Sequence, residues 1–152
     1  MSEETNAFTA DVYVDGKKAG YAKNRGHGDP IQVDWTDYEF GRTVEAWAKA
    51  LPPIESEWGP VKNDIEIIIG DIVEKDRYTK HLNRLRNSLL RRYNKGELIY
   101  RVKGESPGAY THWRGATEER VKARHGEVEF YDPQDPDKFL KALGHIKDEV
   151  VA

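Results

Sequence analysis

The sequence predicts an α+β fold in which an antiparallel sheet opens with an N-terminal β-hairpin and is partly covered by amphipathic helices. Strand-like alternation over residues 8–14 leads into Asp15-Gly16, a dipeptide typical of tight hairpin turns. Apolar residues then recur at helical spacing in several later segments. A chain of 152 residues is long enough to bury a core, so we expect one domain over residues 1–152, with 1–7 as a flexible leader.

The first half of the chain is predicted to pair residues 8–14 with 17–23, because a type I′ turn needs positive φ at both central positions. A third strand is expected over residues 31–35. Apolar residues then follow a helical spacing from Val44 to Leu51, until Pro52-Pro53 stops the helix. The proline-containing stretch at 52–62 is interpreted as a connector.

Residues 65–72 fit both a helix and a strand, and the absence of a turn signal after them favours a helix. A cleaner apolar stripe follows at Tyr78, Leu82, Leu85, Leu89 and Tyr93. The two stripes lie about 110° apart on one continuous helix. We therefore expect a break or bend near residues 74–76, with Asp76 as a new N-cap, and a helix end at Lys95-Gly96.

The last third is predicted to form two paired strands, a short helix, a third strand and a final helix. Their expected positions are 97–103, 109–113, 117–126, 128–131 and 136–150. Asp135 precedes Pro136, the combination of a capping residue with proline at the first helical position.

Composition excludes several classes of protein. The chain has no cysteine, which excludes disulfides, thiolate catalysis and cysteine-ligated zinc. No run approaches the roughly 18 apolar residues that a membrane span needs, and the N-terminus does not resemble a signal peptide. We expect a cytoplasmic protein with no membrane partner.

The net charge of −3 conceals three unlike segments. Residues 1–74 carry −8, residues 75–103 carry +8, and residues 104–152 carry −3. Partners respond to local potential over roughly 8–10 Å, so the basic block is more informative than the total. The alternative is that the acidic flanks fold back and neutralise this block.

The basic block coincides with the second apolar stripe, so its helix is expected to face its leucines inward and its cations outward. We predict that the cations contact nucleic acid or another polyanion; they are Arg77, Lys80, Arg84, Arg86, Arg91, Arg92 and Lys95. Two alternatives remain open: an acidic protein surface as the partner, or an ordinary solvated helix face with no partner.

Two further segments are candidate sites. In the glycine-flanked loop at 24–30, His27 and Asp29 could act on a small nucleotide, although turn geometry alone explains such a loop. The strand-like segment at 110–114 concentrates side chains that can stack on a base, namely Tyr110, His112, Trp113 and Arg114. No catalytic motif, metal site or cofactor is predicted, and we expect the protein not to be an enzyme.

Short motifs give a family resemblance. The segments Val14-Asp15-Gly16-Lys17, residues 24–30, and Val102-Lys103-Gly104 with Pro107-Gly108 resemble those of small uncharacterised proteins of bacterial phages and mobile elements. The resemblance implies an accessory role, such as interference with a host-defence or nucleic-acid-handling complex.

The leading hypothesis is therefore a non-enzymatic module that binds nucleic acid or a nucleoprotein through its basic helix. The first alternative is an inhibitor or adaptor that docks a basic host protein through the acidic N-terminal half. The second is a small-nucleotide binder or hydrolase that uses the 24–30 loop.

Overall fold

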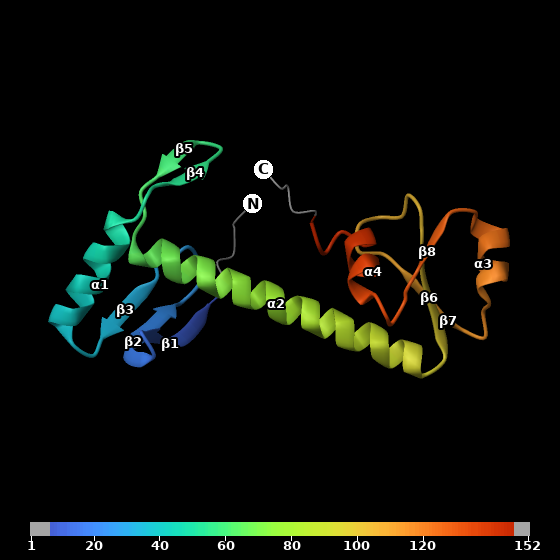
Figure 1. Cartoon of the computed structure of the whole chain (residues 1–152), viewed down its shortest axis with the longest axis horizontal. Coiled ribbons are helices and arrows are strands. Elements are labelled where there is room, and N and C mark those ends of the chain that lie inside the picture. Colours follow the sequence, from blue (N-terminus) through green and yellow to red (C-terminus); the bar gives the residue numbers. More distant parts are fainter. Residues whose placement is uncertain (1–6, 148–152) are drawn as a thin grey trace. The chain divides into compact units, whose positions relative to one another are not determined.

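The computed structural model describes residues 7–147, and within them it contains helices and three antiparallel sheets (Figure 1). This arrangement confirms the predicted α+β class. The chain divides into two compact units, an N-terminal unit of Met1–Asp76 and a C-terminal unit of Arg77–Ala152. Helix α2 (Ile65–Asn94) belongs to both units. The single-domain organisation stays a prediction, as does the leader, most of which lies outside the described residues.

The N-terminal unit is built on a three-stranded antiparallel sheet in the order β1-β2-β3. Its strands are β1 (Phe8–Val14), β2 (Lys17–Asn24) and β3 (Gln32–Trp35). Asp15 and Gly16 connect the first two strands with φ of 50° and 79°. Positive φ at both positions is the signature of the expected hairpin turn, which is therefore confirmed.

Helix α1 (Tyr38–Ala50) begins at Asp37, whose carboxylate accepts hydrogen bonds from the backbone N–H groups of Glu39 and Phe40. It ends before Pro52, as predicted. A Cβ added at Gly41 would come within 2.3–2.7 Å of the Trp35 ring. The helix backbone thus lies directly against the indole, and glycine is the residue that permits this close approach.

The segment predicted as a connector at 52–62 contains a small hairpin instead. Strands β4 (Ile54–Ser56) and β5 (Gly59–Val61) pair antiparallel, and Trp58 lies in the turn between them. The segment connects α1 to α2, but the sequence analysis did not expect strands within it. Pro60 is compatible with this hairpin because both strands of a two-stranded sheet are edge strands.

Helix α2 is continuous through residues 74–76, so the expected break and the new N-cap at Asp76 were wrong. The helical interpretation of residues 65–72 was correct. Ile69 is buried in the N-terminal unit, while Leu82 and Leu89 belong to the core of the C-terminal unit. Because the two apolar stripes pack in different units, no break is needed to bury both.

Charged residues interrupt this helix too often for it to cross a membrane, and the other described helices are no better suited.

The C-terminal unit contains a second three-stranded sheet in the order β7-β6-β8. Its strands are β6 (Glu97–Val102), β7 (Thr111–Arg114) and β8 (Val128–Phe130), and its short helices are α3 (Glu118–His125) and α4 (Pro136–Ala142). Figure 1 shows α3 and α4 on opposite sides of this sheet. The final helix is shorter than predicted because Gly144, with φ of 90°, follows its end; Val150 lies outside the described residues.

The core of the C-terminal unit joins α2 and α4 to one face of the sheet. It consists of buried apolar side chains at Leu82, Leu89, Ile99, Tyr131, Phe139, Leu140 and Leu143. Tyr100 follows Ile99 in β6 and points to the other face of the sheet. There, the centroid of its ring lies 5.9 Å from that of His125 in α3. Helices therefore pack on both faces of the sheet, and the outward side of α2 remains at the surface.

Candidate functional site

The predicted basic residues lie in the C-terminal unit, on or directly after α2. Leu82 and Leu89 are 7% and 1% exposed, which fixes the inward side of the helix. At 100° per residue, Arg84 and Arg91 fall on nearly the opposite side. The predicted amphipathic arrangement of leucines and cations is thus present, although the individual cations differ in what they contact.

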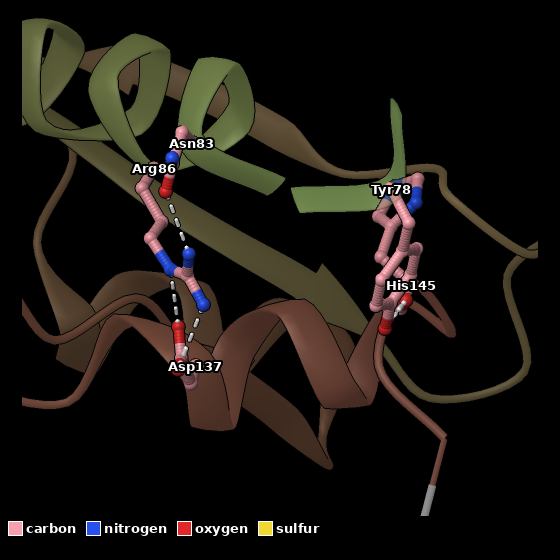
Figure 2. Close-up of polar contacts among 5 residues, drawn as sticks. All are labelled: Tyr78, Asn83, Arg86, Asp137 and His145. Atoms are coloured by element: carbon pink, nitrogen blue, oxygen red, sulfur yellow. Dashed lines mark hydrogen bonds and ion pairs between the residues drawn. The ribbon is translucent and has the colours of Figure 1, made fainter. Parts of the chain in front are cut away.

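Arg86 is bound within the unit. Its Nε lies 2.7 Å from Oδ1 of Asp137, one of its terminal nitrogens lies 3.0 Å from Oδ2, and the other donates to Asn83 (Figure 2). The hydrogen bonds from Arg86 hold the pKa of the Asp137 carboxyl below its usual value and raise that of the guanidinium. Arg86 therefore ties α2 to α4, and we remove it from the proposed contact surface.

The end of α4 is joined to α2 by a second set of contacts. The Tyr78 hydroxyl donates to the backbone carbonyl of His145 at 2.9 Å (Figure 2), and the rings of His81 and His145 approach to 3.5 Å between nitrogens. Burial, with a smaller contribution from His81, lowers the pKa of His145. These contacts join the end of α4 to α2.

Arg92 belongs to a small network with Glu97 and His112. Nδ1 of His112 lies 3.0 Å from Oε1 of Glu97, and a terminal nitrogen of Arg92 lies 3.2 Å from the same imidazole nitrogen. The guanidinium is also within 3.9 Å of the Glu97 carboxylate. One acid is thus shared between an arginine and a histidine, which leaves Arg92 only partly available to a ligand.

Of the basic residues that the sequence analysis singled out, four are exposed and have no polar side-chain partner in the described part of the chain. We call them the cationic face: Arg84, Arg91, Lys95 and Arg114. Arg91, Lys95 and Arg114 line one surface pocket of about 350 Å³, together with Ser88, Arg92 and Glu97. Ser88 and Arg91 also line a second depression that includes Arg84, so the four residues form one continuous surface.

The other two predicted cations, Arg77 and Lys80, lie further toward the start of the unit. Each has an interaction partner within the chain. The cationic face is therefore defined without them.

The structure separates the four candidate stacking residues. Tyr110 packs edge-on against Phe139, with ring centroids 6.1 Å apart, and contributes to the core. His112 is held in the Glu97 network. Trp113 lies on the opposite face of the sheet, with 52% of its surface exposed, and Arg114 belongs to the cationic face.

The loop at 24–30 is a compact turn. The Asn24 side chain accepts from the N–H of Gly26 at 2.8 Å, and the N–H of Asp29 donates to the carbonyl of Gly26 at 3.2 Å. His27 adopts φ of 59°, and both His27 and Asp29 are exposed. No group of three or more metal-ligating side chains occurs among the described residues. Turn geometry accounts for this loop.

The sequence did not reveal which basic residues are bound by side chains of the same unit and which are exposed. Asp137 lies 51 positions from Arg86 in the chain, and His145 lies 64 positions from His81. No local pattern predicts such contacts. The capping signal at Asp135-Pro136 located the start of α4, but it could not indicate which arginine α4 would meet.

No family model, curated protein or solved structure matches this chain. Its function is therefore inferred from the residues of the site itself.

Proposed function

We propose that the protein binds nucleic acid, free or within a nucleoprotein complex, through the cationic face of the C-terminal unit. One observation carries the proposal: Arg84, Arg91, Lys95 and Arg114 are exposed on one continuous surface, without carboxylate partners in the described part of the chain. Arg84 and Lys95 are about 16 Å apart along the helix at 1.5 Å per residue. This span is long enough to contact several successive phosphates.

The distribution of charge between the units supports the same proposal. The C-terminal unit carries 16 Lys and Arg against 11 Asp and Glu, whereas the N-terminal unit carries 8 against 16. A polyanion is attracted to the first unit and repelled by the second. A protein with an acidic surface would be attracted in the same way, and binding measurements with purified nucleic acid distinguish the two partners.

The test is fluorescence anisotropy with labelled DNA and RNA of mixed sequence, titrated between about 50 and 300 mM salt. We expect the logarithm of affinity to fall linearly with the logarithm of salt concentration. The triple variant Arg84→Glu/Arg91→Glu/Lys95→Glu should bind weakly, with a salt slope smaller in magnitude by about 2–3.

The matched control reverses three exposed lysines of the N-terminal unit, in the variant Lys17→Glu/Lys49→Glu/Lys62→Glu. It makes the same change in net charge but should retain most of the affinity. If the wild-type protein shows no salt-dependent binding to either nucleic acid, the proposal is wrong and an acidic protein becomes the better candidate. Equal losses in the two triple variants would also contradict a specific face.

A second candidate function is docking of a basic protein by the N-terminal unit. It is favoured by large apolar side chains exposed in an acidic unit, above all Trp58 at 95% and Trp47 at 56%. Exposed tryptophans at such positions are typical of protein interfaces. Capture of partners after nuclease treatment, with Trp58→Ser as the comparison, distinguishes this function because a partner bridged by nucleic acid would be lost. Both candidates fit an accessory role of the kind that the phage resemblance implies.

A further inference from the structure

We propose that the nucleic acid is single-stranded and that one of its bases stacks on the indole ring of Trp113. The inference rests on the proposed function of the cationic face and specifies which nucleic acid that face binds. It is based on three observations: Trp113 is exposed on an edge strand, Arg114 of the cationic face follows it directly, and the two side chains lie on different faces of the sheet.

Trp113 lies on a strand at the edge of its sheet and remains open to solvent. In the described part of the chain, β7 pairs only with β6 and is an edge strand of its sheet. Trp113 lies directly opposite Leu98, which is half-buried, and cross-strand neighbours of this kind are in contact. With 52% of its surface exposed, the indole has apolar support and still offers area to a ligand.

The other exposed aromatic side chains of this unit already have partners. The Tyr78 hydroxyl is bonded to the His145 carbonyl, and the Tyr93 ring packs edge-on against Tyr131 at 5.9 Å between centroids. Among the described aromatic side chains that the C-terminal unit exposes most, Trp113 is the one with no ring contact or hydrogen bond of its own. It is therefore the best available platform for stacking.

The basic residue that follows Trp113 along the strand also favours nucleic acid. The next residue in the strand is Arg114, which lines the same pocket as Arg91 and Lys95. By contrast, Trp58 lies in the N-terminal unit, which carries an excess of acidic residues and would repel phosphates. Aromatic side chains beside a cationic surface are the arrangement used to bind single strands without sequence preference.

The geometry of β7 separates single strands from duplexes. Successive side chains of a strand point to opposite faces, so Arg114 and Trp113 lie on different faces of the sheet edge. A ligand that touches both must turn sharply around this edge. A single strand can do so, whereas duplex DNA has a persistence length of about 150 base pairs and keeps its bases stacked inside.

The experiment measures binding of the full chain to oligo(dT) and to a duplex of equal length, by anisotropy and by quenching of tryptophan fluorescence. We expect tighter binding to oligo(dT), and a loss of about 5- to 150-fold in that affinity for Trp113→Ala. Trp113→Phe should keep most of the affinity, since phenylalanine also stacks, but should lose the fluorescence quenching. Trp58→Phe is the matched control and should retain both.

Failure of this inference is distinguishable from failure of the proposed function. If both oligonucleotides bind equally and Trp113→Ala changes neither affinity, the single-strand assignment is wrong while the cationic face stands. If the triple charge reversal has no effect, the proposed function itself is wrong. Thermal unfolding of Trp113→Ala shows whether a loss of affinity is caused by misfolding. If it is, the Trp113→Phe variant provides the test. Fluorescence quenching that persists in Trp113→Phe would overturn the inference.

Discussion

At the scale of single residues, the contacts determine which charges are available. Arg86 and Arg84 are two positions apart, but Arg86 forms a two-point contact with Asp137 while Arg84 has no polar partner in the described chain. The two side chains leave α2 in directions about 160° apart. A count of basic residues therefore overestimates the binding surface, because some of the cations stabilise the fold.

His145 provides a prediction on pH dependence. Its pKa is lowered in the folded protein, chiefly by burial, so the unfolded chain binds more protons at mildly acidic pH. The free energy of unfolding should fall as pH drops below about 6.5, the usual histidine pKa, until the lower folded pKa is reached. Chemical denaturation of wild type and His145→Gln between pH 7 and 5 measures this; the variant should show a flatter dependence.

Two controls accompany this measurement. His81→Gln should keep most of the pH dependence, since burial contributes more than the neighbouring imidazole. His27→Gln alters an exposed loop residue and should follow the wild-type curve. An unchanged slope in His145→Gln would show that other groups control stability in this range.

At the scale of secondary-structure elements, two helical glycines illustrate how packing decides the effect of one methyl group. A Cβ at Gly41 would lie 2.3 Å from Trp35, whereas a Cβ at Gly70 would lie 3.6 Å from the end of the Ile31 side chain. The first contact is impossible without movement of the helix or the ring, and the second is ordinary van der Waals contact.

We therefore expect Gly41→Ala and Gly70→Ala to change stability in opposite directions. Gly41→Ala should destabilise the protein by about 1–3 kcal/mol through overpacking. Gly70→Ala should stabilise it by up to about 1 kcal/mol, because alanine favours the helix. Urea denaturation of both variants tests the pair, and a destabilised Gly70→Ala would show that Ile31 cannot accommodate the methyl group.

The elements also show what the sequence could predict. The hairpin at Asp15-Gly16 and the stop at Pro52-Pro53 were predictable because their signals lie within a few residues. The hairpin at 54–61 was missed because prolines are a weak strand signal, although edge strands tolerate them. The break in α2 was wrongly expected because the sequence does not show that the two apolar stripes pack in different units.

The same reasoning applies to the candidate site. Helical periodicity placed Arg84 and Arg91 on the outer side of α2 correctly. It did not predict that Arg86 and Arg92 are bound within the unit. Their partners come from α4 and from the β6–β7 pair, which are separate elements of the chain. Contacts over such separations depend on the tertiary arrangement and leave no local pattern in the sequence.

At the scale of the whole molecule, α2 is the element common to both units. Lys75→Pro, just before the boundary, removes a backbone hydrogen bond and should cost α2 about 3 kcal/mol or more locally. If each unit is held by its own core, amide hydrogen exchange should increase around residue 75 while the amides of β2 and β6 stay protected. Lys75→Ala is the control, and simultaneous loss of protection in both strands would contradict this independence.

The opposite charges of the two units also have a kinetic consequence. A long polyanion approaching by diffusion is pushed away wherever it first meets the acidic residues and is retained where it first meets the basic ones. Long-range electrostatic forces thus favour encounters in which the polyanion first meets the basic unit, before any short-range contact forms. Added salt should then reduce the association rate constant and at the same time allow more misdirected encounters, so that selectivity among approach directions is greatest in dilute buffer.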